Sequence, residues 1–161
     1  MSKEKSRFTI VLVAPEIPGN TGSIGRTCVA LGLRLVLIKP LAFDISEKAV
    51  RRAGLDYWKY VDIQVYENFD HFLETEKPST DKMYFFTKTA TSKPVFKETF
   101  TPDCFLIFGS ETKGLPVEIL EKYKEHNVSF PMYSEHIRSL NLSNVATAAA
   151  YEVLRQIEFK S

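Results

Sequence analysis

The sequence predicts an α/β fold in which a mostly parallel sheet is flanked by helices. Short apolar runs bounded by turn residues alternate along the chain with stretches of helical periodicity. Apolar runs without polar alternation are typical of strands buried on both faces, as in a parallel sheet. With 161 residues, 44% of them hydrophobic, the chain can form one real core. We therefore expect one domain, residues 8–161, behind a flexible tail, residues 1–7.

The expected strands are apolar runs closed by turn residues. The run at 8–14 ends at Pro15, the run at 33–38 follows Gly32, and the run at 104–109 ends in glycine. Short runs between glycine and proline favour strands over helices. The expected strands are 8–14, 33–38, 61–66, 83–87, 104–109 and a shorter one at 127–131.

Helical periodicity fills the stretches between these runs. It is clearest near the end of the chain, where Val145, Ala149 and Val153 recur on one side and neither Gly nor Pro interrupts. Pro116 suits the first turn of a helix. This alternation indicates helices on the faces of a parallel sheet. The expected helices are 21–31, 46–53, 68–74, 116–123 and 142–157.

Composition excludes several classes of protein. No apolar signal core precedes Phe8, and no run approaches the roughly 18 apolar residues of a membrane span. We therefore expect a cytoplasmic protein without membrane contact. Cys28 and Cys104 lie in apolar segments outside any CxxC or Cys/His cluster, which predicts small buried side chains rather than a disulfide or zinc site. The three histidines are not spaced as a metal triad, so we expect no metal.

The net charge of +1 does not indicate nucleic acid, so an RNA-binding surface would have to come from local clusters. Each basic cluster is more typical of a solvated face than of a binding patch. The candidates are Lys3, Lys5, Arg7, Lys48, Arg51, Arg52, Lys88 and Lys93.

Three motifs stand out in the chain. They are PEIPGNTGSIGR at 15–26, FGSETKGLP at 108–116 and IRSLNLSNVAT at 137–147. In content, order and separation they resemble the signature motifs of the SPOUT RNA methyltransferases, and the resemblance covers about residues 8–157. RRAGLDY at 51–57 is a further match, to the small members that 2′-O-methylate the wobble nucleotide of tRNA.

The resemblance implies more than periodicity can show. It implies a C-terminal trefoil knot, which an unaided topology argument would exclude, and a homodimer. It also implies an enzyme that uses S-adenosyl-L-methionine, without a metal, to methylate the ribose 2′-hydroxyl of cytidine or uridine at position 34 of tRNA.

The turn at 109–116 is the candidate cofactor site. It follows an apolar run that ends at Gly109, and ligands collect at the carboxyl ends of strands in α/β sheets. Taken alone, the turn could equally be a plain strand-to-helix connection. The chain has neither a P-loop ending nor a GxGxxG in the right context, which disfavours an ordinary Rossmann enzyme. The resemblance implies adenosine contacts at Phe86, Gly109, Phe130 and Ser139, with Leu140 and Ser143 lining the same cavity.

The resemblance assigns catalysis to Arg26, with Asn20 in support. A guanidinium, with a pKa above about 12, is not normally a base. We therefore expect Arg26 to stabilise the forming alkoxide, the alternative being proton transfer to an RNA phosphate. Asn20 could also act only as a helix N-cap. Glu111, Asn141 and Asn144 are expected to support the site, or to act as caps.

Partner surfaces are predicted at two places. Arg51 and Arg52, near Tyr57 and Trp58, form a basic and aromatic cluster that could grip a single-stranded anticodon loop, although a helix end with a buried Trp would look the same. The last helix carries Ala146, Ala148, Ala149 and Ala150, a surface that another helix can approach closely. We expect a homodimer through this helix and the first one, with Tyr151 nearby.

Alternative functions remain open from the sequence. They are a SPOUT enzyme acting on ribosomal RNA, a non-catalytic RNA-binding protein of the same fold, and a generic nucleotide-binding module. Three positions depart from the family pattern without removing a catalytic group: Gly19 and Ser110, where Pro is common, and Phe130, where a smaller aliphatic is usual.

Overall fold

The computed structural model describes residues 6–52, 55–89 and 91–160, apart from the side chains of Glu47, Val50 and Arg51. Within these residues seven strands form one sheet in the order β3-β2-β1-β6-β4-β7-β5, and neighbouring strands are parallel. The α/β class and the six predicted strands are confirmed. The short β5 was not predicted, because a Lys-Pro pair carries no apolar run. The strands are β1 (Thr9–Val13), β2 (Arg34–Ile38), β3 (Asp62–Tyr66), β4 (Met83–Phe86), β5 (Lys93–Pro94), β6 (Phe105–Phe108) and β7 (Asn127–Ser129).

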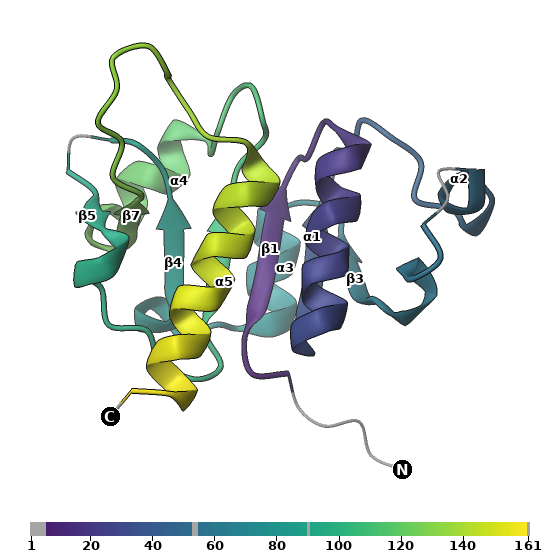
Figure 1. Ribbon diagram of the computed structural model, residues 1–161, viewed down its shortest axis with the longest axis horizontal. Coiled ribbons are helices and arrows are strands. Elements are labelled where there is room, and N and C mark those ends of the chain that lie inside the picture. Colours follow the sequence, from purple (N-terminus) through teal and green to yellow (C-terminus); the bar gives the residue numbers. More distant parts are fainter. Residues whose placement is uncertain (1–5, 53–54, 90, 161) are drawn as a thin grey trace.

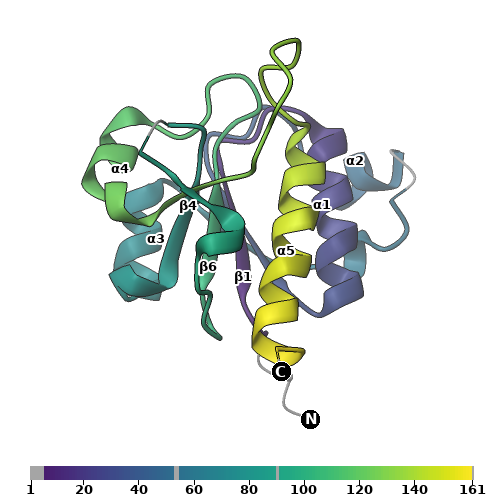
Figure 2. The same ribbon diagram turned by 60° about the vertical axis from the view of Figure 1, so that its left-hand side comes forward.

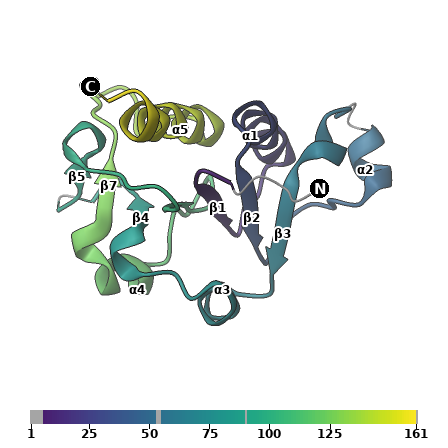
Figure 3. The same cartoon turned by 90° about the horizontal axis from the view of Figure 1, so that it is seen from below.

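Helices cover both faces of the sheet. Seen from below, α1 (Pro18–Leu31) and α5 (Leu142–Glu158) lie over one face, while α3 (Phe69–Glu76) and α4 (Val117–Lys122) lie over the other (Figure 3). The small helix α2 (Glu47–Arg52) lies beyond the β3 edge (Figure 1). The five predicted helices are confirmed, with α1 beginning three residues earlier than expected. Short 3-10 turns lie at Trp58–Tyr60, Thr80–Lys82, Val95–Lys97 and Lys124–His126.

Strand alternation divides the core into two layers. Along β1, Ile10 and Leu12 belong to the cluster that includes residues of α1 and α5, whereas Val11 and Val13 belong to the cluster that includes residues of α3 and α4. This follows from the period of two in a strand, whose successive side chains point to opposite faces. A strand covered on both faces is apolar at nearly every position, and β1, which is buried throughout, is apolar after Thr9.

Helices α1 and α5 lie side by side (Figure 2). Ala146, Ala149 and Ala150 are fully buried among core residues of this same chain, and the hydroxyls of Thr27 and Thr147 lie 2.8 Å apart across the helix pair. The helix that approaches α5 is thus α1 of the same chain, and the expectation that these alanines face a second chain is wrong for three of the four. Ala148 alone of the four is exposed.

The segment that follows α2 packs closely against two glycines of α1. A Cβ added at Gly25 would lie 2.7 Å from the Trp58 ring, and one added at Gly22 would lie 3.1 Å from Leu55. The Tyr57 hydroxyl also donates to the Gly22 carbonyl oxygen at 2.8 Å. Part of the RRAGLDY motif thus packs directly on the first motif, although Ala53 and Gly54 lie outside the described residues.

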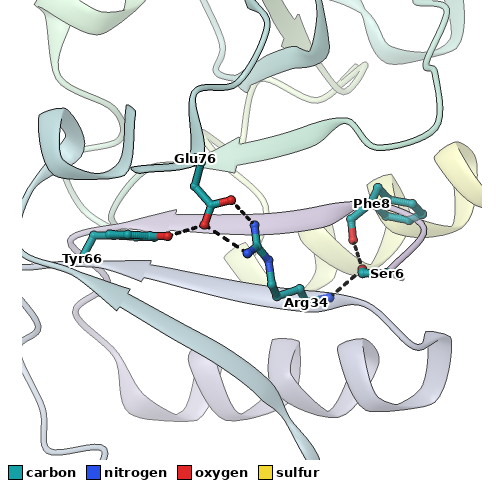
Figure 4. Close-up of polar contacts among 5 residues, drawn as sticks. All are labelled: Ser6, Phe8, Arg34, Tyr66 and Glu76. Carbon is teal, nitrogen blue, oxygen red and sulfur yellow. Dashed lines mark hydrogen bonds and ion pairs between the residues drawn. The ribbon is translucent and has the colours of Figure 1, made fainter. Parts of the chain in front are cut away.

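A polar cluster joins the end of α3 to the start of β2 (Figure 4). Arg34, at the start of β2, donates to both carboxylate oxygens of Glu76, the last residue of α3, at 3.0 and 2.7 Å. The Tyr66 hydroxyl donates to the same carboxylate. Burial raises the pKa of Glu76, but the hydrogen bonds from Arg34 and Tyr66 outweigh it and lower the pKa overall. Ser6 is held as well, accepting from the Arg34 backbone N–H at 3.0 Å.

Candidate functional site

A pocket of about 590 Å³ lies at the carboxyl ends of β4, β6 and β7. Three loops line it: 87–89 after β4, 109–115 after β6, and the stretch between β7 and α5. These loops rise above the sheet at the end away from both termini (Figures 1 and 2). The volume is typical of small-molecule sites, and the carboxyl ends of parallel strands are where α/β proteins bind ligands.

The pocket gathers most of the predicted cofactor residues. Ser143 does not line it, because it lies in the first turn of α5, where its N–H and hydroxyl donate to Asn141 Oδ1 at 2.9 and 2.5 Å. The other five predicted residues come from two loops, the turn after β6 and the stretch between β7 and α5, and from the end of β4. They are Phe86, Gly109, Phe130, Ser139 and Leu140.

Gly109 determines the shape of the turn after β6. A Cβ there would lie 2.1 Å from the Gly114 carbonyl carbon and 2.2 Å from the Leu115 nitrogen, distances that no side chain can occupy. The turn closes through a hydrogen bond from the Gly114 N–H to the Ser110 carbonyl oxygen at 2.9 Å, and Gly114 has a φ of 68°. The loop backbone therefore folds tightly onto itself and forms one wall of the pocket.

A second wall is aromatic. Phe86 stacks on Phe108 with a centroid separation of 4.6 Å and on Phe130 at 6.0 Å, and all three line the pocket. Phe96 meets Phe130 edge to face at 6.3 Å on the exposed side. Phe130 extends this wall. Such a surface suits a planar heteroaromatic ring.

Two carboxylates join the first motif to the turn after β6. Glu111 accepts from the backbone N–H groups of Glu16 and Ile17 at 2.8 and 2.7 Å, where α1 begins without a capping side chain of its own. In return, Glu16 accepts from the Thr112 hydroxyl at 2.7 Å and from its N–H at 3.4 Å. The hydrogen bonds from Thr112 and Ser110 lower the pKa of Glu16. This pair of reciprocal contacts, here called the Glu16–Glu111 clamp, joins residues about 95 positions apart.

Asn20 connects the clamp to the third motif. Its side-chain N–H donates to Glu111 at 3.3 Å, and its side-chain oxygen accepts from Asn141 at 3.1 Å. Asn141 in turn caps α5 by accepting from the Ser143 and Asn144 N–H groups. Asn20 is not an N-cap, because α1 begins at Pro18 and places it in the first turn, where it is 8% exposed. All three motifs thus meet at the pocket through one hydrogen-bonded chain.

Arg26 lies elsewhere on α1. It is exposed and its guanidinium carbon lies 5.5 Å from the centroid of the Tyr57 ring, whereas Asn20 is buried and lines the pocket. Burial raises the pKa of Tyr57, and the charge of Arg26 partly opposes this. Six residues of helix rotate by about 240° and rise about 9 Å, so the two side chains leave the helix on different faces.

The predicted RNA contacts lie away from the pocket. Arg52 is exposed on α2, and the Arg51 side chain lies outside the described residues, as do Lys3 and Lys5. Trp58 is partly buried against Gly25. Of the basic residues singled out from sequence, Lys88 is the one that lines the pocket. Lys113 and Arg138 also line it; they belong to the second and third motifs but to none of the predicted basic clusters. Glu16 and Thr112 were missed as well, since their contact joins two distant loops.

The described residues offer neither a cluster of metal ligands nor a membrane-spanning helix. In the described stretches, the His, Cys, Asp and Glu side chains form no group of three that could hold a metal ion. Within residues 6–52, 55–89 and 91–160, no helix combines the length and the apolar character that crossing a bilayer requires.

The chain is similar to known RNA methyltransferases. Residues 7–151 match the model of the SpoU rRNA Methylase family. The chain is 43% identical over 154 residues to a tRNA (cytidine(34)-2′-O)-methyltransferase of Burkholderia ambifaria, an alignment that covers 95% of this chain and 97% of that protein. A protein of the same name from Burkholderia pseudomallei is 40% identical, with the same coverage.

Solved structures agree in fold. One, from a study of the 2-OH methylation of C/U34 on tRNA, superposes with a TM-score of 0.84 at 37% identity and covers 95% of this chain and 97% of that one. Another is the SpoU methyltransferase AviRb of Streptomyces viridochromogenes in complex with AdoMet. It gives a TM-score of 0.73 at 27% identity and covers 95% of this chain but 62% of that one.

Proposed function

Because this chain belongs to the SpoU rRNA methylase family, we propose that it is the S-adenosyl-L-methionine-dependent enzyme that methylates the ribose 2′-hydroxyl of the wobble nucleotide of tRNA, cytidine or uridine 34. The observation that carries the proposal is the 43% identity to a tRNA (cytidine(34)-2′-O)-methyltransferase over nearly the whole of both chains. The meeting of the three motifs at one pocket supports it. We also propose a cytoplasmic location, which the proposed substrate supports.

The pocket fits the proposed cofactor. The Phe86 and Phe130 wall suits an adenine ring, and the tight turn at Gly109 presents backbone groups that can read its edge. Thr89 Oγ1 is buried at the pocket and has no hydrogen-bond partner within the described part of the chain, so it is available to a polar ligand. When bound, S-adenosyl-L-methionine supplies the methyl group on a sulfonium centre.

The chain's own task is alignment and the handling of one proton. Alignment in such a displacement can supply up to roughly 7 to 11 kcal/mol. We propose that Asn20, fixed between Glu111 and Asn141, orders the start of α1 beside the pocket. We further propose that Arg26 stabilises the alkoxide that forms as the hydroxyl proton leaves, since a guanidinium is a poor base.

We propose a homodimer through the outer face of α1 and α5. Exposed residues on these adjacent helices recur at three- and four-residue intervals, and half of them are Gly, Ala or Ser, which suits close helix packing. Arg26 belongs to this face, so dimerisation would bring it into a protein environment. The face comprises Gly19, Ser23, Arg26 and Ala30 on α1 with Asn144, Ala148, Tyr151 and Arg155 on α5.

We also propose that the chain forms a C-terminal trefoil knot. The three loops that surround the pocket lie together at the carboxyl ends of the strands, which supports a knot there.

We further propose that Arg51 and Arg52 contact phosphates of the anticodon stem. Reversing both charges should weaken tRNA binding, and normal affinity in that variant would remove these residues from the RNA surface.

The experiment that tests the function is methyl transfer to bulk tRNA from labelled S-adenosyl-L-methionine, followed by nuclease digestion and mass spectrometry of the products. We expect a 2′-O-methyl group at nucleotide 34 that is absent with Arg26→Ala. A methyl group at another position or in another RNA would redirect the substrate assignment. Failure to bind the cofactor would overturn the enzyme itself.

A further inference from the structure

The pocket lining is more basic than the rest of the chain. Lys88, Lys113 and Arg138, one from each of the three loops, are exposed residues that line it. Among the described lining residues Glu111 alone is acidic, and its carboxylate is already hydrogen-bonded to the Glu16 and Ile17 N–H groups. Three cations against one carboxylate leave a formal charge of +2 on the lining, whereas the whole chain carries +1.

These cations are poorly neutralised by the protein. Within the described residues, neither Lys88 nor Arg138 forms an ion pair. Lys113 lies close enough to Glu16 to contribute to lowering the pKa of that carboxyl, so its charge is partly balanced. Like charges gathered around a concave, partly desolvated site repel one another, and an anionic ligand relieves that repulsion.

The proposed cofactor does not provide the missing anion. S-adenosyl-L-methionine carries a sulfonium, an ammonium and one carboxylate at neutral pH, so its net charge is positive. An RNA nucleotide, in contrast, is flanked by a phosphate on either side. A nucleotide whose 2′-hydroxyl reaches the pocket must bring both phosphates to the rim where these side chains lie.

We propose that Lys88, Lys113 and Arg138 form a phosphate-binding rim that grips the RNA backbone on both sides of the target nucleotide. The inference rests on the proposed function and adds a substrate contact to the same site. Lys113 contributes least, because Glu16 shares its charge. Arg138 can hold a phosphate through two parallel hydrogen bonds, whereas Lys88 acts as a point charge.

The first test is the salt dependence of tRNA binding. Each of Lys88→Ala and Arg138→Ala should weaken binding and reduce the slope of log affinity against log salt concentration by about 0.7, the value for one lost phosphate contact on a single strand. Lys113→Ala should have a smaller effect on both the tRNA affinity and the salt slope. The matched control is Lys124→Ala, an exposed lysine in the turn before β7, at the opposite end of that strand.

The second test isolates the phosphates. An anticodon stem-loop RNA in which methylphosphonates replace the two phosphates beside nucleotide 34 should bind the wild type more weakly. The Lys88→Ala/Arg138→Ala variant should lose little further affinity on this RNA. Additive losses would overturn the proposal, because the two changes would then act on different contacts.

The outcomes separate the rim from the proposed function. An unchanged salt slope in all three variants, with methylation of nucleotide 34 intact, would remove the rim and leave the function standing. A variant that loses S-adenosyl-L-methionine affinity with a normal slope would reassign its cation to the cofactor carboxylate and overturn the rim. Absence of methylation at nucleotide 34 in the wild type, with slope changes on another RNA, would overturn the function and retain the rim.

Discussion

Gly109 shows how one residue can decide the shape of a binding site. A Cβ at this position would collide with backbone atoms of Gly114 and Leu115, which cannot move aside as a flexible side chain could. We expect Gly109→Ala to weaken S-adenosyl-L-methionine binding by about tenfold or more, since overpacking against rigid neighbours costs on the order of 1–3 kcal/mol. Isothermal titration calorimetry measures this directly.

Gly114→Ala is the matched control in the same turn. A Cβ there meets nothing within 4 Å, so the substitution costs only what its φ of 68° imposes, on the order of 1 kcal/mol. Its cofactor affinity should fall less than that of Gly109→Ala. Equal losses in the two variants would mean that flexibility, and not close backbone contact, explains Gly109.

Glu16 does not line the pocket, but through the Glu16–Glu111 clamp it should affect cofactor binding. Glu16→Ala should raise the KM for S-adenosyl-L-methionine severalfold with a smaller effect on kcat, because the turn after β6 loses its contact at Thr112. Glu16→Gln keeps an acceptor oxygen and should restore part of the affinity. Thr112→Val should add little to Glu16→Ala in the double variant.

The clamp also has a pH dependence. Since the pKa of Glu16 is lowered in the folded protein, its contribution is present above the ordinary value of 4.5 and is lost as pH falls through the lowered value. The difference in cofactor affinity between wild type and Glu16→Ala should therefore narrow in acid. A difference that is constant across this range would show that the carboxylate charge is irrelevant.

Elements pack as closely as their smallest residues allow, and α1 illustrates this. Gly25→Ala places a Cβ 2.7 Å from Trp58, an overpacking cost of about 1–3 kcal/mol, against a gain of about 1 kcal/mol in helix propensity. We expect a net fall of about 1 kcal/mol in the free energy of unfolding, measured by urea denaturation. Gly19→Ala, on the same helix with nothing within 4 Å, should leave stability unchanged or raise it.

The Arg34–Glu76 pair fastens α3 to β2. Glu76→Gln leaves the partly buried Arg34 without its charged partner and should cost about 1–2 kcal/mol, less than a fully buried pair because the side chains are 26% and 15% exposed. The pKa of Glu76 is lowered, so this stabilisation is full above the ordinary value of 4.5 and declines as pH falls through the lowered value.

The exposed pair Lys39–Glu67 provides a control for this prediction. Its side chains are 45% and 69% exposed, and Glu67→Gln should change the free energy of unfolding by less than about 0.5 kcal/mol. Urea denaturation at neutral pH and below pH 4 compares the two variants. A Glu76→Gln effect that persists undiminished in acid would contradict the ionic explanation.

At the scale of the whole molecule, we expect two chains to associate through the outer face of α1 and α5. Ala148→Arg places a long charged side chain on the proposed dimer face and should shift sedimentation equilibrium at micromolar concentration from dimer to monomer. Glu121→Arg, exposed on α4 over the other face of the sheet, is the control and should remain dimeric. A wild type that sediments as a monomer would refute the dimer.

The sequence by itself was enough to predict the strands, the helices and the glycine turn after β6, and it contains the three motifs. Apolar periodicity and turn chemistry are encoded within windows of about ten residues. The tertiary structure decided the rest. It placed Asn20 between Glu111 and Asn141, buried three of the four alanines of α5, separated Arg26 from the pocket and brought Lys88, Lys113 and Arg138 to one rim. These relations join positions up to 121 residues apart, so they depend on the order of strands in the sheet. No local pattern specifies that order.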